Sequence, residues 1–375
     1  MPADIEPFQA MAISRLAHAL KAEGRSVIHM EFGQPSTGAP AAAIAVAHQV
    51  LDHDPMGYWE STELKAALAN HYRETYGVDV EPDQFILTCG ASPALVLALV
   101  SSFDPGQRVA TARPGYVAYR NSLKALHLVP VEIPCGAESR FQLTAAALEQ
   151  LDPAPSGVIL ASPANPTGTI IEAGELARIA AVCRERNILM IADEIYHGLS
   201  YVEPARSLLE FEHDAFVISS FSKYFSMVGW RLGWLLVPQA RIQKLRAFSG
   251  NLFLTAPSLS QHAALVALRN RAELDGHVDV YRRNRDLLLQ ALPKWGLQNI
   301  APPDGAFYLY VDVSRYTRNS LAFCENMLRE TGVATAPGVD FDPVEGSHFI
   351  RFSFAVSTRE TEEAILRLDR WFANG

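Results

Sequence analysis

The sequence contains no long hydrophobic segment, no long basic run and only four cysteines among its 375 residues. No apolar run approaches the ~20 residues that a membrane-spanning helix requires. The N-terminus lacks the cationic start and apolar stretch of a secretory signal. The cysteines, at positions 89, 135, 183 and 324, form no C-x-x-C pair and no metal-binding spacing. We therefore expect reduced thiols, a cytoplasmic location, no metal ion and no membrane partner.

Charge and composition exclude further classes of protein. The net charge is 32 − 41 = −9, and the most basic cluster, residues 281–285, is typical of a solvated helix face, so we expect no nucleic-acid partner. A hydrophobic content of 49% excludes wholesale disorder. The sequence has no G-x-G-x-x-G fingerprint, which argues against a nicotinamide-dependent dehydrogenase, and no Walker A loop, which argues against binding of a nucleotide triphosphate. The length favours two domains.

Apolar strands alternate with helical segments through the middle of the chain. Residues 158–161, 188–192 and 215–218 are apolar throughout, which predicts a parallel sheet covered by helices on both faces. Ligands of such sheets bind beyond the carboxyl ends of the strands. Asn165, Asp193, Tyr196 and Lys223 each follow a strand end. We expect these four side chains to converge on one site.

Lys223 lies among hydroxyls and aromatic residues just after a buried strand. A lysine buried in this way tends to lose its proton and becomes a candidate Schiff-base former. Arg231 follows eight positions later (231 − 223), and with Ser220 and Ser222 it offers the forked cation and hydroxyl donors that suit a phosphate. The alternative is a structural lysine paired with an acid in a large core.

Two glycine-containing turns are further candidates for ligand contacts. Gly33 follows a strand predicted at residues 27–32, where a turn makes backbone amides available. Gly90, Ala91 and Ser92 follow a strand predicted at residues 84–88 and lead into a helix, for which Ser92 is the predicted N-cap. Free amides at a helix N-terminus bind anions. Each turn has a purely structural alternative.

Two other features leave alternatives open. Tyr58 and Trp59 lie on a Pro/Gly-containing loop, and they indicate an interface or a site unless both rings fold back onto the core. Arg351 interrupts an apolar strand predicted at residues 348–354. Its side chain either faces solvent or points into a cleft, where it would bind a carboxylate through two hydrogen bonds.

Together these residues predict a site for pyridoxal 5′-phosphate. Lys223 would form the Schiff base, and Asp193 would keep the pyridine nitrogen protonated so that the ring can act as an electron sink. Asn165 and Tyr196 would hydrogen-bond the phenolate oxygen, and Tyr116 would lie against the ring face. The predicted phosphate-binding residues are Gly90, Ala91, Ser92, Ser220, Ser222 and Arg231.

The chain resembles the class I/II aminotransferases of fold type I over nearly all of its length. The resemblance rests on the order and spacing of five motifs: Asn165-Pro166-Thr167-Gly168, Asp193-Glu194-Ile195-Tyr196, Ser220-Phe221-Ser222-Lys223, Gly229-Trp230-Arg231-Leu232-Gly233 and Phe349-Ile350-Arg351-Phe352-Ser353.

The resemblance implies an α/β fold. A large domain, residues 45–280, would contain a mostly parallel seven-stranded sheet covered by helices. A smaller α+β domain would be formed by both termini, residues 1–44 and 281–375. The implied activity is transfer of an amino group between an L-amino acid and a 2-oxo acid by a ping-pong mechanism.

The resemblance also implies individual roles. Lys223 would hold the cofactor and then act as the base that moves the substrate proton. Arg351 would bind the substrate α-carboxylate, together with Asn165 and the backbone at Gly33. Tyr58 matches the family tyrosine that reaches the phosphate of the neighbouring subunit, which implies a homodimer with shared active sites.

Two departures from the family pattern bear on specificity. Ser92-Pro93 stands where many relatives carry a polar side chain such as glutamine. Residues 248–261 contain no arginine or lysine, whereas dicarboxylate specialists of the family use an arginine of the partner subunit near there. Ile13, Phe32, Tyr58 and Trp59 would supply an apolar lining instead. We therefore expect neutral or aromatic amino acids as donors.

Two other functions remain open at this point. A carbon–sulfur β-lyase of the same fold would also begin with Lys223 removing the α-proton, so the motifs do not separate it from a transaminase. A non-catalytic sensor, like the aminotransferase-like domain of some bacterial regulators, would require an N-terminal DNA-binding domain. Only about 25 residues precede the first predicted strand, which leaves little room for one.

Overall fold

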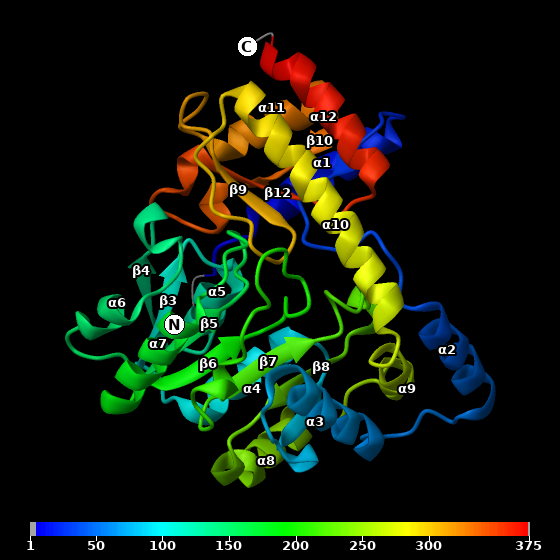
Figure 1. Ribbon diagram of the computed structural model, residues 1–375, viewed down its shortest axis with the longest axis vertical. Helices are drawn as coiled ribbons and strands as arrows, with labels where there is room; N and C mark the ends of the chain where they lie inside the picture. Colours follow the sequence, from blue (N-terminus) through cyan, green and yellow to red (C-terminus); the bar gives the residue numbers. More distant parts are fainter. Residues whose placement is uncertain (1–4, 374–375) are drawn as a thin grey trace.

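The computed structural model describes residues 5–373 and is organised around a seven-stranded sheet (Figure 1). The strand order is β2-β8-β7-β6-β5-β3-β4, and all strands run parallel except β8, which is antiparallel to both of its neighbours. This sheet confirms the predicted fold class. Its strands are β2 (Phe85–Thr88), β3 (Arg108–Arg113), β4 (Val129–Pro134), β5 (Gly157–Ala161), β6 (Leu189–Asp193), β7 (Phe216–Ser220) and β8 (Gly233–Leu236).

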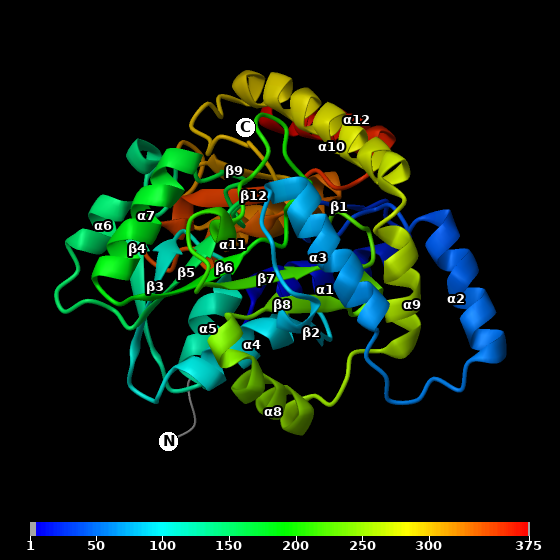
Figure 2. The ribbon, with the colours of Figure 1, turned by 60° about the horizontal axis from the view of Figure 1, so that its bottom comes forward.

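Helices cover both faces of this sheet (Figures 1 and 2). The strands are apolar on both sides because alternate residues enter different hydrophobic clusters: Phe216 and Ile218 pack on one face and Val217 on the other. The covering helices are α3 (Thr62–Tyr76), α4 (Ala91–Ser102), α5 (Val117–Ala125), α6 (Ala145–Glu149), α7 (Ala173–Glu185), α8 (Ile242–Leu252) and α9 (Ser258–Ala267). Helix α2 (Ala41–His53) packs against α9 on the outer side of the molecule.

The two ends of the chain meet in a second group of elements, drawn at the top of Figure 1. Ile28 pairs with Val333 in a parallel two-stranded ladder, and a three-stranded antiparallel sheet has the order β11-β12-β9. The elements are α1 (Gln9–Ala22), β1 (Ile28–His29), α10 (Arg271–Ala291), β9 (Tyr308–Asp312), α11 (Ser320–Thr331), β10 (Val333–Ala334), β11 (Ala336–Pro337), β12 (Phe349–Ser353) and α12 (Thr358–Ala373).

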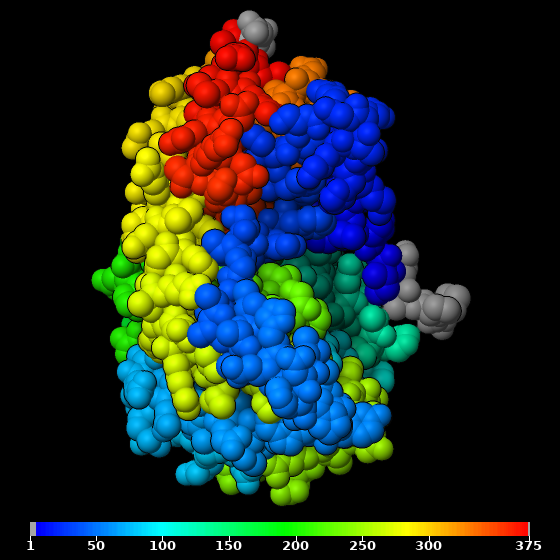
Figure 3. Space-filling model, turned by 90° about the vertical axis from the view of Figure 1, so that its right-hand side faces the viewer, coloured from blue at the N-terminus to red at the C-terminus, as the bar shows by residue number. Residues whose placement is uncertain are grey.

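The predicted domain boundaries at 44/45 and 280/281 stay a prediction. Helix α10 runs without a break across the second of them. The N-terminal residues, blue in Figure 3, pass from the second group of elements down one face of the molecule toward the large sheet. None of the helices within residues 5–373 combines the length and apolar character that a membrane-crossing helix requires.

One local prediction is wrong. Helix α4 begins at Ala91 with Gly90 as its N-cap, so Ser92 lies inside the first turn. Gly90 has φ +96° and ψ 179°, a conformation that residues with a side chain rarely adopt. A Cβ atom at this position would also lie 2.6 Å from Nη2 of Arg231. The close approach of Arg231, which sequence spacing does not reveal, therefore favours glycine at the position just before the helix.

Candidate active site

A cavity of about 380 Å³ lies where the loops after β5, β6 and β7 converge. Most of the predicted site residues line it, although they come from distant parts of the chain. They are Gly33, Ala91, Ser92, Tyr116, Asn165, Asp193, Tyr196, Ser222, Lys223, Arg231 and Arg351.

Lys223 projects into this cavity from the turn after β7. Its Nζ donates a hydrogen bond to the carbonyl oxygen of Gly33, at 2.5 Å. Removal from bulk water and the cationic Arg351 and Arg231 together lower the pKa of the Lys223 amine from 10.5 to about 8, against the opposing charge of Asp193. About a tenth of this amine is therefore neutral and nucleophilic at pH 7.

Asp193 ends strand β6 and is buried at the floor of the cavity. Its Oδ2 accepts a hydrogen bond of 2.6 Å from the hydroxyl of Tyr119, and its Oδ1 accepts one from the amide of Ile195. Burial raises the pKa of the Asp193 carboxyl, while the bond from Tyr119 opposes that shift. Tyr119 was not among the predicted site residues. Its position three residues after Tyr116, which caps the start of α5, is the signal that would have indicated it.

Arg351 points into the cavity rather than to solvent, which resolves the alternative left open by its sequence pattern. Its Nη1 donates to Oδ1 of Asn165 at 2.7 Å, and its Nη2 donates to the carbonyl oxygen of Glu31 at 2.5 Å. The guanidinium lies 4.4 Å from the ring centroid of Tyr308 and 4.7 Å from that of Phe341. Because the two rings lie against the faces of the guanidinium, its N–H groups along the edge remain for hydrogen bonds in the cavity.

Tyr308 is a second residue that the sequence reading missed. Its hydroxyl is 2.7 Å from the hydroxyl of Tyr196, within hydrogen-bonding distance. A Cβ atom at Gly33 would lie 1.6 Å from the Tyr308 oxygen, so only glycine fits at that position. This steric requirement explains the glycine after β1, and it places a backbone turn directly against the cavity.

Arg231 and the start of α4 form the positively polarised end of the site. Arg231 adopts φ +52°, an uncommon conformation that directs its guanidinium to the carbonyl oxygens of Val228 (3.0 Å) and Cys89 (3.2 Å). The Gly90 amide donates to the Thr88 carbonyl, so the amides that begin the helix without intrahelical acceptors are those of Ala91 and Ser92.

Three predicted residues do not line the cavity. Gly90 lies behind Arg231, and the hydroxyl of Ser220 accepts a hydrogen bond from the amide of Ser222 at 3.0 Å. Tyr58 is 85% exposed on its loop. Of the residues predicted to form an apolar lining, only Phe32 lines the cavity of this chain. Phe8 lines it as well.

The other residues of the predicted apolar lining lie elsewhere. Ile13 is buried among the terminal elements, because it is on the inner face of α1. Trp59 stacks on His262 with ring centroids 4.4 Å apart.

The residues present fit pyridoxal phosphate. An aldehyde requires an amine of reduced pKa, and Lys223 supplies one. A phosphate requires a cation beside unpaired amides, and Arg231 lies against the start of α4. A protonated pyridine nitrogen requires a carboxylate, and Asp193 is the buried acid of this cavity. Among the described residues, no group of three or more histidine, cysteine or acidic side chains is arranged to hold a metal ion.

The fold and the cavity together define a fold-type I enzyme that uses pyridoxal phosphate. A sequence model described as aminotransferase class I and II matches residues 25–368. The chain belongs to this family and is an aminotransferase, with an amino acid and a 2-oxo acid as its substrates.

Individual relatives agree with this assignment. A valine–pyruvate aminotransferase of Mycobacterium tuberculosis is 44% identical over 98% of this chain and 97% of its own length. The crystal structure of an aminotransferase from M. tuberculosis, also 44% identical, superposes with a TM-score of 0.96 and covers 99% of this chain and 98% of its own. An aspartate aminotransferase from Thermus thermophilus with maleate is 28% identical, with a TM-score of 0.91 and coverage of 98% and 97%.

Proposed function

We propose that this enzyme moves the amino group of a neutral L-amino acid, with valine as the leading candidate, to a 2-oxo acid such as pyruvate. The observation that carries the proposal is the set of arginines in the cavity. Among the described residues that line it, these are Arg231, beside the predicted phosphate site, and Arg351, beside the predicted carboxylate site. Within one chain no third arginine lines the described cavity, and residues 248–261, near which dicarboxylate specialists of the family carry the arginine of the partner subunit, contain neither arginine nor lysine. The name of the 44% identical relative supports the same donor and acceptor.

The proposed mechanism assigns a separate task to each side chain. Pyridoxal phosphate, when bound, supplies an aldehyde carbon that accepts the amino group and a ring that withdraws electrons from the α-carbon. The neutral amine of Lys223 would take the proton from the α-carbon of the substrate and return a proton to the carbon that has received the amino group. Asp193 would keep the ring nitrogen of the cofactor protonated. Asn165 accepts from Arg351 with Oδ1, so its Nδ2 would be free to donate, together with the hydroxyl of Tyr196, to the phenolate oxygen of the cofactor.

We also propose that the enzyme is a homodimer in which Tyr58 of each subunit reaches the phosphate of the other. Tyr58 is 85% exposed, which is unusual for an aromatic ring on an otherwise ordered surface. Large apolar side chains nearby in sequence are also exposed, Ile44 and Leu51 on α2 and Met56 on the same loop. Burial of such residues against a second copy would remove apolar area from water.

A cytoplasmic location remains a prediction. It rests on the four cysteines, all of which are free thiols, three of them buried.

The test is to mix the purified, cofactor-loaded protein with single amino acids, without any oxo acid, and to record the visible spectrum. We expect valine, methionine or phenylalanine to convert the cofactor from its pyridoxal to its pyridoxamine form, and aspartate to do so far more slowly. Faster conversion by aspartate would contradict the proposed specificity.

The same experiment separates the alternatives. Release of ammonia and pyruvate from cystathionine, without lasting pyridoxamine, would instead indicate the β-lyase. Cofactor binding with no spectral change for any amino acid would indicate the non-catalytic sensor.

A further inference from the structure

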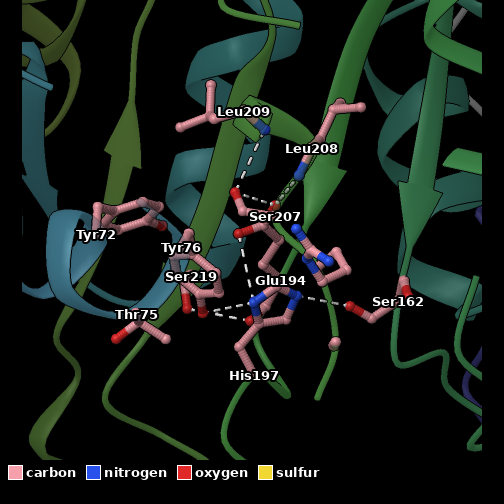
Figure 4. Close-up of polar contacts among 12 residues, drawn as sticks. Tyr72, Thr75, Tyr76, Ser162, Glu194, His197, Ser207, Leu208, Leu209 and Ser219 are labelled. Carbon is pink, nitrogen blue, oxygen red and sulfur yellow. Dashed lines mark hydrogen bonds and ion pairs between the residues drawn. The ribbon is translucent and has the colours of Figure 1, made fainter. Parts of the chain in front are cut away.

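A buried polar cluster around Glu194 and His197 lies next to the strand ends that carry the active-site residues (Figure 4). Neither residue is part of the cavity lining. Glu194, the residue after Asp193, is 3% exposed. Its Oε1 accepts hydrogen bonds from the hydroxyl of Ser207 at 2.9 Å and from the amide of Leu208 at 2.8 Å. Its Oε2 has no hydrogen-bond partner within the described residues.

The second member of the cluster is His197, whose side chain is 8% exposed. Its Nε2 is 3.0 Å from the carbonyl oxygen of Ser162, and its Nδ1 is 2.7 Å from the hydroxyl of Tyr76. A carbonyl oxygen can only accept, so Nε2 carries the proton and Nδ1 accepts from Tyr76. Burial lowers the pKa of His197 to about 3, so the ring is neutral in this arrangement. Nδ1 is also 3.6 Å from Oε2 of Glu194.

The cluster connects the ends of three neighbouring strands. Ser162 follows β5 and lies three positions before Asn165. Glu194 follows β6; its amide donates to the carbonyl of Ile218 in β7, and its carbonyl accepts from the hydroxyl of Ser219 at 3.3 Å. These same strand ends deliver Asn165, Asp193 and Lys223 to the cavity. A shift of any one of them would change the distances between all three groups.

We propose that Glu194 and His197 are positioning residues, which hold the ends of β5, β6 and β7 together so that Asn165 and Asp193 meet the cofactor ring in the correct geometry. The inference rests on the proposed function of Asn165 and Asp193. His197 acts through the Ser162 carbonyl on the loop that carries Asn165. Glu194 acts through its carboxyl group, which fixes the chain directly after Asp193 to Ser207 and Leu208. Neither side chain touches the cavity in which the reaction takes place.

The competing explanation is that the cluster contributes only to the stability of the fold. Two substitutions at one site separate the two explanations. In His197→Gln the side-chain amide reaches the place of Nε2 and can still donate to Ser162. In His197→Asn the shorter side chain ends near the place of Nδ1 and cannot. Both variants lose the imidazole and most of its packing. Only Gln keeps the hydrogen bond to Ser162, and only Asn can keep the one from Tyr76, so Tyr76→Phe is measured beside them to give the effect of losing the Tyr76 bond alone.

The experiment measures the dissociation constant of pyridoxal phosphate for the cofactor-free protein, the visible spectrum of the loaded protein and the melting temperature. We expect His197→Asn to weaken cofactor binding roughly 10- to 100-fold, the range found for supporting residues of other sites, and to shift the absorbance of the bound cofactor. His197→Gln should keep most of the cofactor affinity of the unsubstituted protein and an absorbance close to that of its bound cofactor. Equal cofactor affinity in the two variants, or unchanged affinity in both, would overturn the proposal.

Ser101→Ala is the matched control, because it removes a buried hydrogen bond within α4 (2.7 Å to the Leu97 carbonyl) far from these strand ends. It should lower only the melting temperature; a comparable loss of cofactor affinity would count against the proposal. If His197→Asn does not fold, Tyr76→Phe tests the same cluster, with an expected loss of a few-fold in cofactor affinity, and no loss would overturn it. These measurements use no amino acid, so they can be interpreted even if the proposed transamination fails.

Discussion

Arg351 and Asn165 lie 186 positions apart in the chain, and Nη1 of Arg351 donates a hydrogen bond of 2.7 Å to Oδ1 of Asn165. One residue belongs to β12, among the terminal elements, and the other to the loop after β5 of the large sheet. The bond therefore joins the two groups of elements across the cavity. It also orients both side chains before a substrate arrives, which reduces the ordering that binding requires.

Replacement of Arg351 should impair recognition of the substrate carboxylate. Loss of a buried charged partner costs roughly 2–5 kcal/mol, so we expect kcat/KM for valine to fall by about 30-fold to several thousand-fold in Arg351→Gln. Isobutylamine, which is valine without its carboxylate, is the matched substrate and should react equally poorly with both proteins. An equal fold-loss for valine and isobutylamine would show that Arg351 does not act on the carboxylate.

Lys223→Ala should abolish the covalent link to the cofactor. We expect the absorbance of the lysine-bound cofactor to disappear. The rate of amino transfer should fall by roughly 10²–10⁴-fold, which is the usual contribution of a positioned acid–base group. The check is the visible spectrum after gel filtration, with single-turnover rates measured on valine. An unchanged spectrum would exclude Lys223 as the attachment site.

Capture of the cofactor by the cofactor-free protein should depend on pH through Lys223. Burial and the neighbouring arginines lower the pKa of this amine from 10.5 to about 8, and only the neutral amine attacks the aldehyde. We expect the rate of capture to rise with pH up to about 8 and to level off above it, as measured by stopped-flow absorbance.

Arg351→Gln removes one of the cations that lowers the Lys223 pKa and should move this midpoint to higher pH. A midpoint near 10, or one that is unaffected by Arg351→Gln, would contradict this account.

Glu194→Gln should change how stability depends on pH. Burial raises the pKa of Glu194 from 4.5 to about 8. Between these values the folded protein holds a proton at this site that the unfolded chain has lost, so the contribution of Glu194 to the free energy of unfolding falls as pH rises through that window. The variant lacks this titration. Its free energy of unfolding relative to the unsubstituted protein should therefore increase from pH 4.5 to 8, by at most ~1.4 kcal/mol per pH unit.

Urea titrations of both proteins at several pH values, at one protein concentration and with saturating cofactor, test this expectation. The pKa of Asp340 is also raised by burial, to about 6, but that group titrates in both proteins and cancels in the difference. Parallel stability curves for the two proteins would show that Glu194 keeps an ordinary pKa in the fold.

Tyr58→Phe tests the proposed contact between subunits. The variant keeps the ring and removes only the hydroxyl, so we expect an unchanged molar mass in light scattering and cofactor affinity reduced by roughly 10-fold, as for loss of one hydrogen bond to a charged group. An unchanged cofactor affinity in Tyr58→Phe would show that the ring is buried between the subunits without a contact from its hydroxyl to the phosphate. A monomeric unsubstituted protein would rule out the contact altogether.

Patterns in the amino-acid sequence are sufficient to predict the class of the sheet and the chain positions of the reactive groups. Apolar strands such as residues 215–218 are recognisable because both faces of a parallel sheet are buried, and Lys223 stood out as a charge placed directly after one of them. Strand β4 escaped notice because it lies at the sheet edge, where Pro130, Glu132 and Pro134 are tolerated and hide the apolar pattern.

The contacts between distant parts of the chain depend instead on how the elements pack in three dimensions. Whether Arg351 faces solvent or the cavity depends on what packs against β12, and the rings of Tyr308 and Phe341 settle it. The partnership of Tyr119 with Asp193 and the burial of Glu194 beside His197 likewise depend on how distant segments approach each other. Sequence patterns report which face of an element is apolar, whereas hydrogen-bond partners are set by the three-dimensional packing of the elements.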